Sequence, residues 1–323
     1  MKYRNLGKTN RSVSAMGYGM WGLAGWTGSD EKEVNKALDK AVEMGCNFFD
    51  TAWDYGAGKS EQMLAELIKR NRGSQLIAAT KIPPMNKKWP PVKGSSIEEV
   101  FPVHHIMEYT EKSLKNLQTD AIDLLHFHVW EDEWSKRDEW KMAVLKLKQE
   151  GKVKSFGISV NRWEPSNCLQ ALESRLIDVV QVIYNIFDQS PEDELFPYCL
   201  ENNIGVIARV PFDEGSLTGG LTKTTVWPEG DWRNIYFCKE NLVPTVDRVE
   251  ALKKVVHEGM TLPELNLKFI LNHPAVSTII PGMRKVQHVE ENMNAVKGKL
   301  LSLEMMQHLK QYRWDRQPTV WSC

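Results

Sequence analysis

The sequence lacks the features that mark membrane, secreted and nucleic-acid-binding proteins. In its 323 residues no apolar run reaches the roughly 18 residues needed to span a bilayer. The segment Met1 to Asn10 is polar, unlike the apolar core of a signal peptide. Lysine and arginine number 41 against 42 aspartates and glutamates, and the interspersed charges leave no basic face for nucleic acid. These absences predict a cytoplasmic protein that binds neither membrane nor nucleic acid.

Cysteine is also scarce, and no two cysteines form a C-x-x-C pair. The five copies are Cys46, Cys168, Cys199, Cys238 and Cys323. Scattered and odd in number, they indicate thiols in a reducing compartment, neither a disulfide framework nor a zinc site. The hydrophobic share of 42% and the charged share of 26% are typical of a globular protein with a full core. No coiled-coil pattern is present, so the oligomeric state stays open.

What the sequence does contain is a regular alternation of short β-branched runs with helix-period segments. An apolar stripe over 34–42 predicts a helix that Asp30 and Glu33 begin as a capping box and Gly45 ends. Ser60 is expected to cap the next helix. The expected strands are Ser14–Gly19, Cys46–Asp50, Leu76–Lys81, Ile122–His128, Val153–Ser159, Asp178–Tyr184, Gly205–Val210 and Val276–Pro281.

Strands separated by single helices imply parallel pairing through right-handed crossovers. Eight such units close naturally into a (β/α)8 TIM barrel, so residues 1–323 are expected to form one barrel domain. An open doubly wound sheet is the structural alternative. Residues 2–13 predict a β-hairpin that plugs the barrel floor, and residues 212–244 a long βα-loop insert of the kind that often forms a lid. An extra helix is expected at the C-terminus.

Two patterns of dinucleotide enzymes occur without their structural context. Gly17 to Gly22 fits G-x-G-x-x-G, but the mechanism needs a helix directly after the third glycine, and the next helix begins only near Asp30. Tyr55 and Lys59 have the spacing of short-chain dehydrogenases, yet two of the three intervening residues are glycines that disfavour the required helix. Neither pattern is interpreted as a cofactor site.

Four chemically active residues lie at or just after predicted strand ends, where parallel barrels build their active sites. They are Asp50, Tyr55, Lys81 and His128. A lysine ammonium would lower the pKa of the tyrosine from its ordinary value of about 10, with the aspartate holding the lysine charged and the histidine orienting a substrate carbonyl. No side chain can hold a hydride, so a nicotinamide cofactor must supply it. The set predicts carbonyl reduction with Tyr55 as the general acid.

The same residues resemble the signature of the aldo-keto reductase family. Asp50-Thr-Ala-Trp-Asp-Tyr55-Gly is similar to the motif D-T-A-x-x-Y-G, and Ala78–Lys81 and Ile122–His128 are similar to the two strands that follow it in the family. The match continues in order through Ser60-Glu61, Phe156–Ser159, Val180–Asn185 and Ile280–Asn292, over nearly the whole chain. The resemblance implies an NADPH-dependent oxidoreductase that reduces an aldehyde or ketone to an alcohol.

The resemblance also implies an extended NADPH across the barrel mouth. Ser159, Asn161 and Gln181 would hold the carboxamide, and the loop 215–218 would wrap the pyrophosphate. Arg284, with Lys285 beside it, would pair with a 2′-phosphate, which favours NADPH over NADH. The implied cofactor contacts are Met20, Trp21, Ser159, Asn161, Gln181, Arg209, Phe212, Gly215, Ser216, Leu217, Thr218, Gly282, Met283, Arg284, His288, Glu291 and Asn292.

Three positions depart from the family pattern. Val160 stands where the family usually has asparagine, which here follows at Asn161. Arg209 stands where an aromatic residue commonly stacks on the nicotinamide, although a planar guanidinium can also lie on a ring. His126 faces the same side of its strand as His128. A metal-dependent hydrolase site built on this His-x-His pair would need a third ligand and would be repelled by a nearby lysine, so no metal is predicted and His126 is interpreted as a buried supporting group.

Tryptophans crowd the predicted rim of the barrel mouth. Flat apolar rings with nearby carboxylates at Asp54, Glu131 and Asp132 suit a polar, sugar-like carbonyl compound. The rim tryptophans are Trp21, Trp26, Trp53, Trp89, Trp130, Trp134, Trp227 and Trp232, of which Trp21, Trp53, Trp89 and Trp130 are expected to bind substrate. Two alternatives to a reductase stay open, namely a regulatory NADPH-binding barrel with little turnover and a metal-dependent barrel hydrolase.

Overall fold

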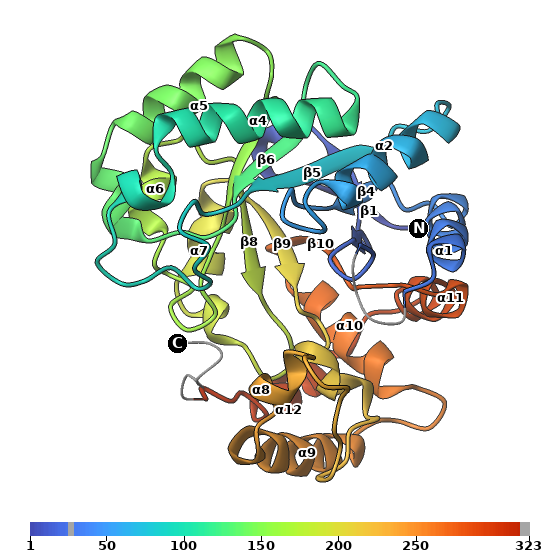
Figure 1. The fold of residues 1–323 in the computed structure, drawn as a ribbon. Coiled ribbons are helices and arrows are strands. Elements are labelled where there is room, and N and C mark those ends of the chain that lie inside the picture. Colours follow the sequence, from blue (N-terminus) through green and yellow to red (C-terminus); the bar gives the residue numbers. More distant parts are fainter. Residues whose placement is uncertain (25–28, 317–323) are drawn as a thin grey trace.

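Eight parallel strands form the centre of the molecule in a computed structural model that describes residues 1–24 and 29–316 (Figure 1). Trp26 and Cys323 therefore lie outside the described residues. Neighbouring strands follow one another in sequence order, and parallel bridges from Met16 to Ile279 and from Gly19 to Gly282 join the first strand to the last. The barrel strands are β3 (Tyr18–Gly19), β4 (Phe48–Asp50), β5 (Ile77–Ile82), β6 (Leu124–Phe127), β7 (Phe156–Ser159), β8 (Val179–Ile183), β9 (Gly205–Arg209) and β10 (Val276–Ile279). The (β/α)8 barrel is confirmed, and the open sheet is not formed.

The expected first strand, Ser14–Gly19, is divided between two sheets. Ser14 ends β2 (Ser12–Ser14), which pairs antiparallel with β1 (Tyr3–Asn5) around the 3-10 turn η1 (Gly7–Thr9), whereas only Tyr18–Gly19 forms the barrel strand β3. The hairpin is thus present as expected. A Cβ on Gly7 would stand 2.2 Å from the backbone nitrogen of Gly205, so only glycine lets the hairpin seat against β9.

The hairpin closes the floor of the barrel with apolar side chains. Leu6 and Val13, which flank its turn, are buried in one cluster with inward-facing residues of the strands, among them Ile77, Leu124 and Val179. Each such side chain stabilises the fold by about 1.5–3 kcal/mol relative to its exposure in water. The interior is therefore dry and apolar at its base, which leaves polar side chains to the opposite end.

The helices cover the outside of the barrel. They are α1 (Glu31–Glu43), α2 (Lys59–Arg70), α3 (Ile97–Val100), α4 (Val103–Leu117), α5 (Glu139–Gln149), α6 (Leu169–Glu173), α7 (Leu195–Glu201), α8 (Arg233–Tyr236), α9 (Lys239–Lys253), α10 (Leu262–Asn272), α11 (Val286–Ala295) and α12 (Leu303–Lys310), with short 3-10 turns η2 (Asp132–Lys136), η3 (Ser190–Glu192) and η4 (Asp213–Thr218). The C-terminal extra helix is α12. No helix within the described ranges is long and apolar enough to cross a membrane.

The helix starts follow local chemistry that the sequence only partly reveals. Asp30 caps α1 as expected, because its side chain accepts a hydrogen bond of 2.9 Å from the amide of Glu33. The expected cap at Ser60 is wrong: α2 begins at Lys59, after Gly58 with φ of 92°. The buried hydroxyl of Ser60 accepts a hydrogen bond of 2.7 Å from Thr51 instead, which ties the helix to the end of β4.

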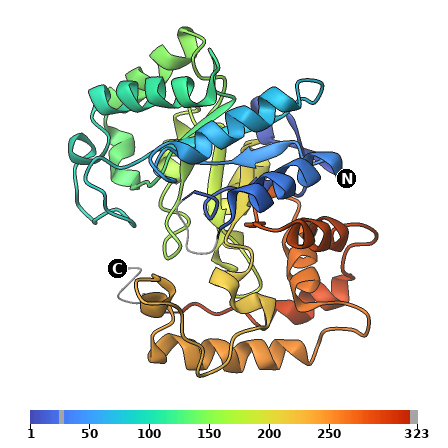
Figure 2. The ribbon, with the colours of Figure 1, turned by 45° about the vertical axis from the view of Figure 1, so that its right-hand side comes forward.

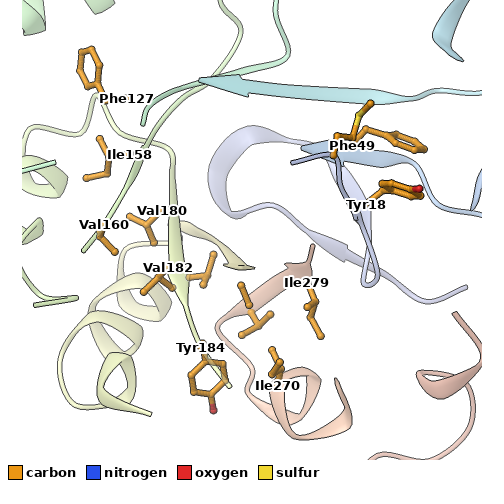
Figure 3. Packing of buried hydrophobic residues seen from close by; sticks show 14 of the residues in the cluster. Tyr18, Phe49, Phe127, Ile158, Val160, Val180, Val182, Tyr184, Ile270 and Ile279 are labelled. Atoms are coloured by element: carbon orange, nitrogen blue, oxygen red, sulfur yellow. The ribbon is translucent and has the colours of Figure 1, made fainter. Parts of the chain in front are cut away.

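Outward-facing strand residues form the main core between barrel and helices. Figure 3 shows Ile158, Val180, Val182 and Ile279 from three strands pointing toward this layer, with Ile270 of α10 packed nearby. All five side chains are fully buried. Because outward positions pack the helices and inward positions fill the barrel, each strand is buried on both faces, as a parallel sheet requires.

The segment after β9 builds a separate unit over one end of the barrel. The strands β8 and β9 point toward the region that holds α8, α9 and α12 in Figure 1, and Figure 2 shows α9 running along the outside of this region. Tyr236, Phe237, Leu242 and Val246 form a small apolar cluster of their own here. The expected insert, 212–244, is too long at its C-terminal end, because α9 already begins at Lys239 and contains Pro244.

Candidate active site

A cavity of about 1380 Å³ opens at the C-terminal ends of the strands. Its lining includes Gly19 from β3, Asp50 from β4, Ser159 from β7, Gln181 from β8 and Arg209 from β9. Parallel barrels place their reactive groups at this end because all strand termini and the following loops converge there. The volume exceeds the about 300–1,000 Å³ of a typical small-ligand pocket, which leaves room for a dinucleotide together with a small substrate.

Three side chains, called here the mouth cluster, form the polar base of this cavity: Asp50, Tyr55 and Lys81. The Lys81 ammonium donates hydrogen bonds to Asp50 Oδ2 at 2.6 Å and to the carbonyl of Thr51 at 2.7 Å. It also donates to the Tyr55 hydroxyl, at 3.4 Å. Lys81 is fully buried and Asp50 nearly so, whereas Tyr55 is half-buried and lines the cavity. The structure thus brings together three of the four chemically active residues expected from the sequence.

Strand register and one tight loop put these side chains in contact. Asp50 ends β4 opposite Ala79 of β5, two residues before Lys81, so both side chains point into the barrel at neighbouring levels. Tyr55 reaches back over them from the loop after β4, which turns sharply at Gly56 with φ of 69°. A Cβ on Gly56 would lie 2.8 Å from that of Ala24, so the glycine is needed for close approach as well as for the turn.

The protonation states of the mouth cluster follow from burial and charge. Burial lowers the pKa of Lys81, but the Asp50 and Tyr55 partners outweigh it and raise this pKa above its ordinary value, so the lysine stays charged. Burial raises the pKa of Tyr55, and the Lys81 charge opposes this without overcoming it. The expected net lowering of the tyrosine pKa is therefore wrong for this structure, because desolvation is the larger influence. The phenol holds its proton at neutral pH.

His128 follows β6 and completes the group at the mouth. Its ring lies 5.8 Å from that of Tyr55 and 6.0 Å from that of Trp89, in edge-to-face contacts. Burial, and next the Lys81 charge, hold the pKa of His128 well below its ordinary value. A neutral imidazole beside the phenol is suited to orient a carbonyl oxygen by hydrogen bonding and is a poor source of protons.

His126 lies one level deeper, opposite Lys81 on the neighbouring strand. It is fully buried, and burial together with the Lys81 charge lowers its pKa to about 3. A Cβ on Gly157 would stand 2.5 Å from the His126 ring, so this glycine makes space for the imidazole. Over residues 1–24 and 29–316, no group of three or more His, Cys, Asp or Glu side chains is arranged to hold a metal ion.

The expected carboxamide-binding residues gather on the other side of the mouth. Gln181 donates a hydrogen bond of 2.7 Å to Asp50 Oδ1, which leaves its own carbonyl oxygen as the group able to face a ligand. Asn161 lines the cavity but uses its side-chain oxygen to accept from the amide of Trp163 at 3.0 Å. Arg209 donates to the carbonyl of Val160 at 3.1 Å. Two of the three family departures, Val160 and Arg209, are thus in contact with one another.

Most of the expected cofactor residues line the cavity. Those that do are Trp21, Ser159, Asn161, Gln181, Arg209, Phe212, Gly215, Thr218, Gly282, Arg284, His288, Glu291 and Asn292. Met20, Ser216, Leu217 and Met283 are fully buried and lie outside this lining. Arg284 and Lys285 directly precede the start of α11 at Val286, where backbone N–H groups also favour an anion.

The aromatic rim differs from the expectation at several positions. Trp21, Trp89 and Trp130 line the cavity, whereas Trp53 packs edge-to-face on Tyr109 at 4.7 Å, outside it. Trp134 is buried in the main core. Trp227 stacks on Phe237 at 5.2 Å and Trp232 meets Trp21 edge-to-face at 5.7 Å, so the insert reaches across the cavity to the loop after β3.

Two of the three acids expected at the rim have structural partners instead. The Asp132 carboxylate accepts hydrogen bonds of 2.8 and 2.9 Å from the amides of Gln170 and Ala171 near the start of α6. Glu131 accepts from Asn167 at 2.9 Å. Only Asp54 lines the cavity, where it pairs with Lys87 at 3.0 Å. The rim is consequently less acidic than the sequence suggested.

Sequence reasoning missed a buried group of charges next to the cavity. Arg162, Asp188, Asp213, Tyr236 and Arg316, called here the outer ionic cluster, come from four distant segments. Asp213 Oδ1 accepts from both arginines, at 3.1 and 2.9 Å, and the Tyr236 hydroxyl accepts from both at 2.5 and 3.0 Å. No local motif announces such a cluster. The one available signal was the pair Asp213-Glu214, two acids within the loop implied to wrap a pyrophosphate.

Comparisons with known proteins agree with this geometry. The sequence model of the aldo/keto reductase family matches residues 15–313. The chain belongs to the aldo-keto reductase family. It is 30% identical over 303 residues to the NADP(+) aldo-keto reductase yakc of Schizosaccharomyces pombe, covering 90% of this chain and 86% of that protein. It is 29% identical over 315 residues to the NADH-specific methylglyoxal reductase of Escherichia coli, covering 92% and 94%.

A solved structure gives the same result for the fold. An aldo-keto reductase of Bacillus halodurans in its holo form superposes with a TM-score of 0.77 at 29% identity, covering 100% of this chain and 99% of that one. This aldo-keto reductase is therefore an oxidoreductase that uses a nicotinamide cofactor. Its own residues fit such a group, because the large cavity carries the free carbonyl of Gln181 and the buried, unpartnered His128 Nδ1 among its described polar atoms.

Proposed function

We propose that this aldo-keto reductase reduces an aldehyde or ketone to an alcohol with NADPH, and that Tyr55 is the general acid. The observation that carries the proposal is the buried hydrogen-bonded chain from Asp50 through Lys81 to the Tyr55 hydroxyl at the cavity surface. A bound reduced nicotinamide supplies the hydride. The protein's part is to orient the carbonyl and to deliver a proton to its oxygen.

The proton pathway follows from the states of the mouth cluster. Tyr55 keeps its proton at neutral pH, since burial raises its pKa. As negative charge grows on the substrate oxygen, the phenol releases that proton, and the Lys81 ammonium stabilises the phenolate that remains. Asp50 keeps Lys81 charged throughout, and neutral His128 donates a hydrogen bond that fixes the carbonyl. A positioned general acid contributes about 10²–10⁴ to the rate.

The preference for NADPH is supported by the basic pair at the start of α11. Arg284 lines the cavity and Lys285 precedes the helix, which together suit the dianionic 2′-phosphate that distinguishes NADPH from NADH. Ser159 and Gln181 would hold the carboxamide, and the loop through Gly215 and Thr218 the pyrophosphate. The E. coli relative is specific for NADH, so replacing Arg284 by alanine is the direct way to test this preference.

The substrate class is supported by the character of the rim. Trp21, Trp89 and Trp130 give flat apolar walls, and Asp54 adds a hydroxyl-binding carboxylate. A small polar carbonyl compound, such as an open-chain sugar, matches this mixture of rings and one acid better than a long apolar aldehyde does.

The decisive experiment follows NADPH absorbance with a panel of sugars, aromatic aldehydes and short ketones, comparing the wild type with Tyr55→Phe. We expect turnover with the wild type and a loss of about 10²–10⁴-fold in the variant, with NADPH affinity retained, because only the proton is removed. Tight NADPH binding without turnover on any carbonyl would favour the regulatory barrel instead. If NADPH fails to bind to the wild type, the proposal is wrong.

A further inference from the structure

Arg209 occupies an unusual place at the edge of the cavity. It is the last residue of β9, opposite Ile183 of β8, and it lines the cavity. Its Nη2 crosses the end of β8 to donate to the carbonyl of Val160 at 3.1 Å. Val160 in turn donates its amide to the carbonyl of Gln181 at 2.9 Å. The guanidinium is thus held beside Ser159 and Gln181, the pair expected to bind the carboxamide.

The charge of Arg209 is poorly compensated. Within residues 1–24 and 29–316, no carboxylate lies within 4 Å of it, and its buried Nε has no hydrogen-bond partner. The nearest acid of the mouth, Asp50, already uses one oxygen for Lys81 and the other for Gln181. Burial lowers the pKa of Arg209, and the neighbouring Arg162 lowers it further. A buried cation without a partner is costly, so its presence calls for a functional explanation.

Glu214 does not remove this imbalance. Burial raises its pKa to about 7, which leaves the carboxyl only partly charged at neutral pH. Its backbone has φ of 56° in the loop of η4, so the chain conformation, and not an ion pair with Arg209, fixes its place. The positive charge of Arg209 therefore acts on whatever occupies the adjacent cavity.

We propose that Arg209 makes this site discriminate between the redox states of its cofactor, because a fixed cation beside the ring tolerates the neutral reduced nicotinamide and repels the positively charged oxidised one. This inference rests on the proposed function, since it needs the nicotinamide to lie on Ser159 and Gln181. Its consequence for the reaction is direct. The oxidised product leaves readily after carbonyl reduction, and alcohol oxidation is disfavoured because the oxidised cofactor binds weakly.

The size of the effect follows from electrostatics. Two unit charges about 8 Å apart at an effective dielectric constant of about 20 change an equilibrium about thirty-fold. The cavity is open to solvent, so screening reduces this value. We expect the wild type to prefer NADPH over NADP+ by about ten-fold more than a variant in which the charge is removed.

The test measures the dissociation constants of three ligands by calorimetry on the full chain. The ligands are NADPH, NADP+ and 2′-phospho-ADP-ribose, which lacks the ring. The proteins are the wild type, Arg209→Gln, which loses the charge but keeps a donor for Val160, and Arg209→Lys, which keeps the charge. Because each protein is judged by a ratio of affinities, a general loss of folded material does not affect the result.

The proposal expects the ratio of the NADP+ and NADPH dissociation constants to fall about ten-fold in Arg209→Gln and to stay near the wild-type value in Arg209→Lys. An unchanged ratio in Arg209→Gln overturns it, as does an equal weakening of all three ligands, which would assign Arg209 to a phosphate. A lysine variant that behaves like the glutamine variant also overturns it, because shape would then matter and charge would not. Failure of the wild type to bind NADPH overturns the proposed function as well, and so is distinguishable from failure of this inference alone.

Discussion

The mouth cluster and the outer ionic cluster are built from the same groups, namely carboxylates, cations and one tyrosine, all withdrawn from water. In the outer cluster the Tyr236 hydroxyl accepts from two arginines and donates to Asp213 at 3.1 Å, and Ser216 satisfies the remaining Asp213 oxygen at 2.7 Å. In the mouth cluster, by contrast, the Tyr55 hydroxyl has Lys81 as its one hydrogen-bond partner among the described side chains.

The difference lies in what remains available to a ligand. A tyrosine whose hydrogen and lone pairs are all engaged can only hold segments together, whereas one that keeps its hydrogen facing a cavity can donate it. Burial raises the pKa of both phenols, so acidity does not distinguish them. Open hydrogen-bonding capacity beside a cavity, and not the presence of buried charge, marks the reactive cluster.

The largest expected effect comes from removing the cation of the mouth cluster. Lys81→Met leaves Asp50 buried without its charge partner, which costs about 3–5 kcal/mol of stability. Turnover should fall at least about 10²-fold, because the phenolate loses its stabilising charge. Urea unfolding and NADPH oxidation measure the two effects.

The double variant Asp50→Asn, Lys81→Met is the matched control for this change. It removes both charges, so it should regain most of the lost stability while remaining inactive. A fully active Lys81→Met enzyme would contradict the comparison, since the mouth cluster would then be as purely structural as the outer one.

Breaking the outer cluster should give the opposite pattern. Arg316→Met removes two charged hydrogen bonds, to Asp213 and Tyr236, and we expect a loss of about 1.5–3 kcal/mol with kcat within two-fold of the wild type. Arg313→Met is the control, because its pair with Asp193 is exposed and contributes about 0–1 kcal/mol. Thermal unfolding and steady-state kinetics decide the matter, and a large fall in kcat for Arg316→Met would erase the distinction.

The smallest expected effect separates the two clusters by pH. The pKa of His126 in the folded state, about 3, lies below its unfolded value of about 6.5, so the unfolded chain takes up a proton first. The stability that neutral His126 contributes is complete above about pH 6.5 and is lost as the pH falls, by about 1.4 kcal/mol per unit. Between pH 7 and 5.5 the wild type should lose about 1 kcal/mol more than His126→Gln.

The outer cluster should be insensitive in that window. Burial raises the pKa of Asp213, but Arg316 and then Arg162 outweigh it and hold the pKa below its ordinary value of 3.8. Its contribution is therefore present above about pH 4 and is lost only below it. Identical slopes for the wild type and His126→Gln between pH 7 and 5.5 would show that the histidine does not titrate on unfolding as its burial requires.

Much of the fold and the reactive centre was predictable because both depend on strand periodicity. A residue at the end of a parallel strand points to the barrel mouth if its alternation is right, and Asp50 and Lys81 meet that condition. The D-T-A-x-x-Y-G motif added Tyr55, and the hairpin was signalled by its own turn. These features are local, or they repeat along the chain.

The remainder depended on contacts between distant segments. The pKa of Tyr55 was misjudged because the sequence reveals a lysine neighbour but not how much water is excluded. Trp53 was assigned to the substrate because its loop was right, yet its ring turned outward onto Tyr109. Arg162 and Arg316 are 154 positions apart in sequence, and only the tertiary fold brings them to the same aspartate.

Closure of the barrel through the bridges from Met16 to Ile279 and from Gly19 to Gly282 also sets a schedule for synthesis. As the chain leaves the ribosome, β3 has an unpaired edge until almost nine-tenths of the protein has emerged, and the hairpin waits for β9 before it can seal the base. Exposed strand edges invite pairing with other chains. A nascent chain stalled before β10 should therefore be the species that most needs a chaperone, and one released after β10 should not.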